Sequence, residues 1–173
     1  GYDGSKLTKA KMMSQLNILR DYKGYAYMIP GNHDWWNVVN VKKGKKNLLK
    51  EQKFVEDTLR TFTSLQNYNT GTFLPSEGSA GPVFREVDEN RIRLIFIDSY
   101  RLLLEESEDD PDTIFLSKFY HDLDDQLSEA SLKKKKVVVV AHHPIYSIGK
   151  HSQPMMRVEK LGKRFGTSNS NYP

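Results

Sequence analysis

Two short segments of this chain hold residue types that can bind a metal or move a proton. Residues 31–34 (Gly-Asn-His-Asp) directly follow one apolar segment, and residues 142–143 (His-His) directly follow another. Histidine nitrogens and the amide oxygen of asparagine are both metal ligands, and imidazole exchanges protons near neutral pH. In an α/β sheet, the loops at the carboxyl ends of strands converge on one site. Together the two segments therefore favour a metal-assisted site built from nitrogen and oxygen donors.

Each segment taken alone also has a purely structural interpretation. A Gly-Asn-His sequence is a common turn, and His-His-Pro can simply cap a strand. His121 lies in a helical pattern among acidic residues and is expected at the surface. Asp98 ends an apolar segment, and we favour a capping role for it over a catalytic one. Trp35 and Trp36 are expected in the core, although they could also wall a substrate cleft.

The elements that must position these segments alternate along the chain. Apolar spacing predicts amphipathic helices, and apolar runs bounded by turn residues predict strands. The helices are expected over residues 7–22, 47–65 and 113–132, and the strands over residues 25–29, 82–87, 91–97 and 137–140. A polar Asp-Glu-Asn turn makes the second and third strands a hairpin, and the last strand, which lacks polar alternation, should be buried on both faces. Helices between apolar strands indicate a layered α/β fold.

The composition restricts the function classes further. The chain has 173 residues, of which 38% are hydrophobic and 28% charged, a balance that fits one globular domain. It has no cysteine, which excludes disulfides, cysteine nucleophiles and thiolate metal sites. Its longest apolar run has five residues, so no membrane-spanning segment is expected. The net charge of +4 comes from short lysine runs that acidic runs partly offset. No nucleic-acid motif accompanies them, so no nucleic-acid partner is expected.

Together the two segments are far more specific than either alone. Residues 31–34 after a strand, followed about a hundred residues later by an apolar strand and His-His-Pro-Ile-Tyr-Ser at residues 142–147, resemble the calcineurin-like metallophosphoesterase superfamily. His151, nine residues beyond His142, is similar to the pattern of the purple (tartrate-resistant) acid phosphatase branch. The middle of the chain resembles bacterial secreted or cell-envelope members at residues 73–75, 81–83 and 94–99.

The resemblance implies a fold and an activity. The fold would be a metallophosphoesterase-type β-sandwich flanked by helices, which is a layered α/β (α+β) domain. The activity would be hydrolysis of phosphoric monoesters, as in acid phosphatases. Two metal ions, iron together with zinc, manganese or a second iron, would generate hydroxide near neutral pH. The substrate would be a phosphorylated small molecule or protein, and the protein would lie outside the cytoplasm, whether secreted, periplasmic or in the cell envelope.

The resemblance also implies a metal-ligating or catalytic role for four residues. Asn32 and His142 would be ligands of the same metal ion. His33 and His151 would be catalytic and would lie just outside the metals, near the phosphate and the leaving oxygen. At that position an imidazole can supply a proton at the operating pH.

Three further residues would support this site. Asp34 would orient His33 or the turn by hydrogen bonding. His143 would lie outside the metals or be structural, and Tyr146 would lie near the substrate.

The pattern departs from the family at both ends. The family's Asp-x-His and Gly-Asp-x-x-Asp (or Tyr) blocks should precede the Asn-His segment, and its Gly-His-x-His block should follow the last histidine, yet these blocks are not found there. Two ligands cannot hold two metals. We therefore expect residues 1–173 to be one partial domain from the middle of a longer enzyme, with further domains of the same polypeptide as partners. Its motifs lie in residues 25–151, and residues 166–173 are expected to be irregular. The alternative is a catalytically inactive domain that serves as an interaction or structural module of a larger envelope assembly.

Overall fold

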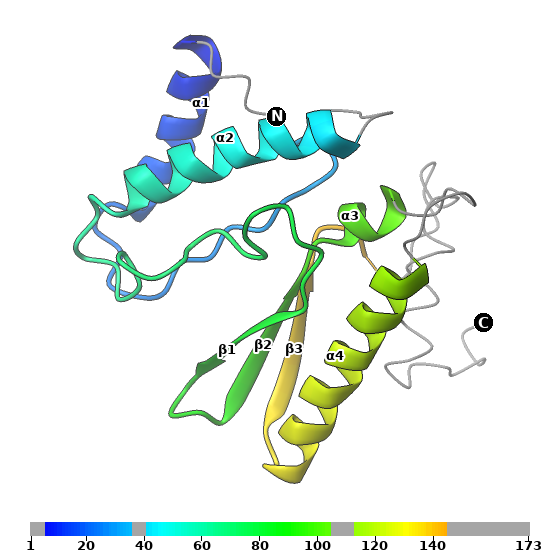
Figure 1. Cartoon of the computed structure of the whole chain (residues 1–173). Helices are drawn as coiled ribbons and strands as arrows, with labels where there is room; N and C mark the ends of the chain where they lie inside the picture. Colours follow the sequence, from blue (N-terminus) through cyan, green and yellow to red (C-terminus); the bar gives the residue numbers. More distant parts are fainter. Residues whose placement is uncertain (1–5, 36–40, 105–112, 145–173) are drawn as a thin grey trace, which may run out of the picture.

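A three-stranded sheet carries one long helix along its face, and two further helices pack over the loops beyond its end (Figure 1). The computed structural model describes residues 6–35, 41–104 and 113–144. Its elements are α1 (Lys6–Leu16), the 3-10 helix η1 (Asn17–Leu19), α2 (Val41–Leu59), β1 (Val83–Val87), β2 (Ile92–Ile97), α3 (Ser99–Leu104), α4 (Thr113–Leu132) and β3 (Lys136–Ala141). No helix in these ranges is long and apolar enough to cross a membrane.

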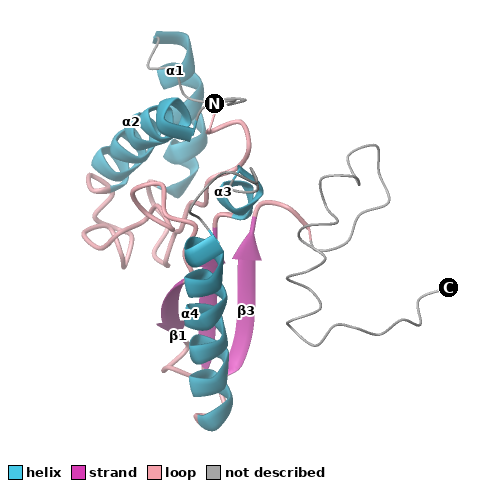
Figure 2. Cartoon of the chain, turned by 45° about the vertical axis from the view of Figure 1, so that its right-hand side comes forward, coloured by secondary structure: helices cyan, strands magenta, loops and turns pink. Residues whose placement is uncertain are grey.

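The sheet has the order β1-β2-β3 and combines both kinds of pairing. β1 and β2 form the predicted antiparallel hairpin, and residues 88–90 close it with left-handed backbone angles, φ of 53°, 54° and 65°. β2 and β3 are parallel, with Ile97 opposite Ala141. Parallel strands need a crossover connection, and α3 and α4 provide it; Figure 2 shows α4 running lengthwise against the sheet. The predicted α/β class is confirmed.

The apolar side chains form two separate cores. The first lies between α1, α2 and the neighbouring loops and includes Trp35, which is fully buried. The second lies between α4 and one face of the sheet and includes Ile95 and Leu123. The short helix α3 contacts both, because Tyr100 packs against the first core and Leu102 belongs to the second. α3 therefore joins the two halves of the molecule.

The strand expected over residues 25–29 is not formed. This segment makes a single parallel bridge, between Met28 and Phe73, held by two backbone hydrogen bonds of 2.7 and 2.8 Å. Two residues earlier, the Asn67 side chain satisfies both backbone groups of Ala26, accepting from its amide at 3.0 Å and donating to its carbonyl at 2.8 Å. A side chain, unlike a neighbouring strand, offers no continuing row of backbone donors and acceptors, so no ladder extends from it.

The helices differ from the prediction at three points. The helix expected over residues 7–22 is an α-helix from Lys6 to Leu16 only and ends as the 3-10 helix η1 at Leu19. α2 begins at Val41 and ends at Leu59, in each case six residues before the expected position. Its first turns are the lysine run, which is helical because lysine has a high helix propensity. The helix stops where the hydroxyls of Thr58 and Thr61 bond to backbone carbonyls at 2.8 and 2.7 Å. α3, which the apolar pattern did not predict, has only six residues.

The expectation that the last strand is buried on both faces is wrong. Val137 and Val139 pack against the second core under α4. Val138, on the opposite face, is 47% exposed. β3 is the last strand in the order of this sheet, and the described elements leave its second face partly open.

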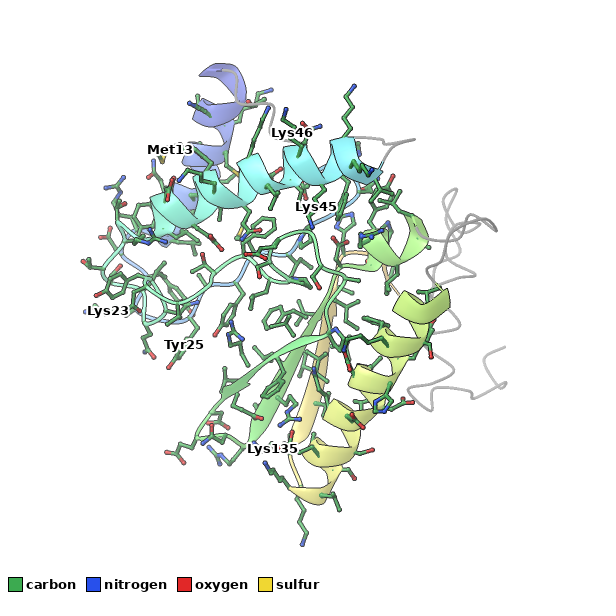
Figure 3. The ribbon with its side chains drawn as sticks, viewed as in Figure 1. Met13, Lys23, Tyr25, Lys45, Lys46 and Lys135 are labelled. Carbon is green, nitrogen blue, oxygen red and sulfur yellow. The ribbon has the colours of Figure 1, made fainter. Side chains whose placement is uncertain are left out.

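A buried charge cluster ties the sheet to α4 at the end away from α3. Arg93 on β2, with 1% of its side chain exposed, bonds Glu86 on β1 at 2.7 Å and Glu129 on α4 at 2.9 Å. Lys135, labelled in Figure 3, reaches Glu86 at 2.9 Å from the residue before β3. Burial opposes ionisation of Glu86, but its hydrogen bonds to Lys135 and Arg93 outweigh burial and lower its pKa.

We expect Arg93→Met to lower the free energy of unfolding by about 3 kcal/mol, because two carboxylates would lose their shared buried cation. The matched control is Arg91→Met. Its ion pair with Asp88 joins side chains that are 68% and 48% exposed, so its loss should cost less than about 1 kcal/mol. Urea denaturation of both variants measures the difference, and equal losses would contradict a stabilising role for the buried cluster.

Candidate metal site

The carboxyl ends of β2 and β3 lie side by side, so the polar residues that follow the two strands lie close together. The parallel register sets Ile97 opposite Ala141. The next residues are therefore Asp98 and Ser99 on one strand and residues 142–143 on the other. The candidate residues after β3 thus gather at the edge of the sheet that the α/β pattern predicted.

The Asn32 segment reaches this edge as a tight turn. Asp34 closes the turn twice, because its amide donates to Gly31 O at 3.1 Å and its Oδ2 accepts the Gly31 amide at 2.7 Å. A carboxylate that bonds the backbone in this way stabilises a turn. Asn32 is half-buried and His33 is exposed. Asp34 therefore shapes the turn, and its expected effect on His33 stays a prediction.

Asn32 and His142 meet although 110 residues separate them, with Asn32 Oδ1 lying 3.1 Å from His142 Nε2. The approach depends on Gly31. A Cβ on that residue would come within 2.9 Å of His142 Cε1 and Nδ1. The imidazole therefore lies directly against backbone that only glycine leaves uncovered.

The start of α3 holds His143. Ser99 Oγ accepts the His143 amide at 3.1 Å and lies 2.8 Å from His143 Nδ1. Burial, and secondarily the charge of neighbouring His142, lowers the pKa of His143. Since Ser99 Oγ accepts the amide proton, its own proton is free to go to Nδ1, which favours a neutral ring. Sequence reasoning missed Ser99, whose only signal is its place directly after an apolar strand.

Asp98 connects the Asn32 turn to α3. The residue is fully buried. Its Oδ2 accepts the indole Nε1–H of Trp35 at 2.7 Å, and its Oδ1 accepts the amides of Tyr100 and Arg101 at 3.1 and 3.0 Å. Burial raises the pKa of Asp98 to about 7, although these hydrogen bonds oppose the shift. The two amide bonds confirm the predicted capping role, whereas the bond to Trp35 was not predicted.

The other candidate residues lie away from this cluster or outside the described ranges. His121 is exposed on α4 and pairs with Asp125 at 3.0 Å, as expected for a surface histidine. Trp36, Tyr146 and His151 lie outside the described residues. Their expected roles stay predictions.

The Asn32–His142 pair fits a metal ion. An ion about 2.1 Å from a histidine nitrogen and an amide oxygen, with the two bonds at about a right angle, would hold the donors about 3 Å apart. The separation of Asn32 Oδ1 and His142 Nε2 is 3.1 Å. Nitrogen and oxygen donors of this kind suit zinc, iron and manganese. Within residues 6–35, 41–104 and 113–144 no group of three His, Asp or Glu gathers for a metal. These ranges therefore supply two donors of a larger set.

We expect Asp98→Asn to remove a pH dependence from folding stability. The Asp98 pKa of about 7 exceeds its usual value of 3.8, so the folded state retains a proton that the unfolded state has lost between these two pH values. The contribution is therefore fully present below about pH 4 and is lost as pH rises to about 7, at up to roughly 1.4 kcal/mol per pH unit.

Urea denaturation of both proteins from pH 4.5 to 8 tests this prediction. The difference between the two curves isolates Asp98, because the lowered pKa of Glu86 acts in the opposite direction in both proteins. Parallel curves across the whole range would rule the effect out.

A second substitution, Gly31→Ala, tests the close contact. The added methyl group would meet the His142 ring at 2.9 Å, so we expect the ring to move and the Asn32–His142 hydrogen bond to break. Stability should change by less than about 1 kcal/mol, because an exposed side chain can give way. Gly71→Ala is the control, since its new Cβ would have nothing nearer than 3.8 Å. Crystal structures of both variants test whether the His142 ring moves. A His142 imidazole in its parent position in Gly31→Ala would refute the prediction.

Comparison with known proteins identifies the family of this chain. The sequence model of the calcineurin-like phosphoesterase family matches residues 6–167. None of the curated proteins and none of the solved structures compared with the chain matches it. The family consists of phosphoester hydrolases that generally bind divalent metal ions. The matched range contains both the Asn32 turn and the His142 strand end, and the chain belongs to the calcineurin-like phosphoesterase family.

Proposed function

We propose that this chain carries part of a dinuclear metal centre that hydrolyses phosphoric monoesters, as in the purple acid phosphatase branch of the family. One observation carries the proposal. Asn32 Oδ1 and His142 Nε2, from segments 110 residues apart, converge to 3.1 Å at the carboxyl end of the sheet. Two donors that lie this close, on segments fixed by the fold, have the arrangement that a pair of metal ligands requires.

In this proposal Asn32 and His142 hold one of the two metal ions. Two such ions, when bound, activate water for attack on phosphorus and neutralise the charge that develops on the phosphate oxygens. His33, exposed at the tip of the turn, is free to contact a bound phosphate. His33 and His151 are the candidates for giving a proton to the leaving oxygen.

Two residues support the ligand pair without binding metal. Asp34 keeps the turn closed, which holds Asn32 and His33 in one orientation. His143 has a lowered pKa, so at neutral pH it adds no positive charge beside the metal ligands. Tyr146 is proposed to lie near the substrate.

The ligand set is completed, in this proposal, by residues outside the described ranges or elsewhere in a longer polypeptide. Two donors cannot neutralise or hold two cations. The chain has no cysteine, so the proposed iron, with zinc, manganese or a second iron, binds through nitrogen and oxygen. A phosphorylated small molecule or protein as substrate, and a location outside the cytoplasm, belong to the same proposal.

The alternative is a family member that has lost catalysis and serves as an interaction or structural module. The observation that favours it is the small donor set of residues 6–35, 41–104 and 113–144. This alternative predicts that the intact protein takes up no iron, zinc or manganese, which elemental analysis measures directly.

We expect His142→Ala in the full-length polypeptide to abolish metal retention and to lower hydrolysis of p-nitrophenyl phosphate by at least about 100-fold, because a ligand is lost. His121→Ala is the matched control, since that histidine is exposed on α4, where it pairs with Asp125. Elemental analysis and steady-state rates on both variants test the assignment. Full activity in His142→Ala would sink it.

A further inference from the structure

The two ligand-bearing segments are connected by more than their own contact. Asn32 lies on a turn beside the first core, while His142 ends a strand that belongs to the second. The direct contact between them consists of the His142 ring lying against Gly31 and one 3.1 Å hydrogen bond between side chains near solvent. A bond of that kind is too weak to hold two segments in one geometry. Something buried must align them.

Asp98 has the right connections for this task. Its two carboxylate oxygens bond to different segments: Oδ1 serves the α3 amides of Tyr100 and Arg101, while Oδ2 accepts Trp35 Nε1 at 2.7 Å. A helix cap needs only one of these oxygens, and Ser or Asn caps as well as Asp. The bond from Oδ2 to Trp35 is therefore not required by the helix.

Each carboxylate oxygen of Asp98 is connected, through other residues, to one of the two metal-ligand candidates. Oδ2 is connected to Asn32 and Oδ1 to His142. Trp35 follows directly on the turn that Asp34 closes, so holding its indole also holds Asn32 at the tip. On the other side, the cap sets the start of α3, where Ser99 bonds both Nδ1 and the amide of His143. His142 directly precedes His143, so fixing the backbone of His143 also fixes the position of His142.

We propose that Asp98 is a positioning residue that couples the Asn32 turn to the His142 strand end, through Trp35 on one side and Ser99 on the other. The significance of this coupling for catalysis rests on the proposed function. The coupling itself is a property of the folded chain and is measurable without any metal.

Trp35→Phe is the decisive variant, because it keeps an aromatic ring in the first core and the cap of α3 but removes the indole donor. NMR-detected amide exchange on the full chain reports the result. We expect the amides of Gly31 and Asp34, and across the site that of His143, to exchange about tenfold faster, as for loss of one buried hydrogen bond. The β1–β2 amides should exchange at the parent rate.

Two further variants separate coupling from general loosening. Phe62→Leu also removes aromatic volume from the first core, where Phe62 is 3% exposed, but it touches no bond to Asp98. Ser99→Ala should free the His143 amide and, because a coupling acts in both directions, also raise exchange at Gly31 and Asp34 while the β1–β2 amides keep the parent rate. The proposal is overturned if Trp35→Phe changes these amides no more than Phe62→Leu does, or if Ser99→Ala leaves Gly31 and Asp34 at the parent rate.

Asp98→Asn serves if Trp35→Phe does not fold. It keeps the volume of the side chain, but an amide has one acceptor oxygen and can serve either Trp35 or the α3 amides. Exchange must then rise on one side of the site, and parent rates on both sides would refute the coupling. A parallel titration of the full-length polypeptide with Mn²⁺ alone distinguishes the two proposals. No binding there counts against the metal centre, while the exchange data still decide the role of Asp98.

Discussion

The parallel pairing of β2 with β3 is the constraint on which the rest of the site depends. It sets Ile97 opposite Ala141, so the residues that follow each strand are neighbours by construction. A shift of one residue would turn every side chain of β3 to the opposite face and would bury the wrong ones under α4. Because Val137 and Val139 face the second core, a one-residue slip is excluded, and the observed register brings Ser99 to His143.

Buried polar groups anchor both ends of β2. At one end, Arg93 joins β1, β2 and α4 through two carboxylates. At the other, Asp98 joins the end of β2 to Trp35 in the first core. The two ends differ in chemistry. The carboxylate of Glu86 is stabilised by cations, and its pKa is lowered. Asp98 accepts hydrogen bonds from neutral donors, and these bonds together with the charge of Arg101 do not outweigh its burial, so its pKa is raised.

The elements predicted correctly are those whose signal is local. The hairpin has a polar turn between two apolar runs, and α4 has apolar pairs at helical spacing over its whole length. The elements predicted wrongly depend on distant partners. Residues 25–29 read as a strand, but the Asn67 side chain occupies the backbone of Ala26. α3 is too short to show a period and exists because Asp98 caps it.

The sequence by itself determined the chemistry that this protein can offer: histidine, asparagine and aspartate after apolar segments, no thiolate, and a motif order that matches its family. These properties are carried by residue types and spacing along the chain. Only the tertiary structure decided that Asn32 and His142 approach to 3.1 Å, and that Trp35 and Ser99 are the partners of Asp98 and His143. The physical reason is that such contacts depend on strand register and on the packing of two cores. The local periodicity of a sequence specifies neither the register of two strands nor the packing of one core against another.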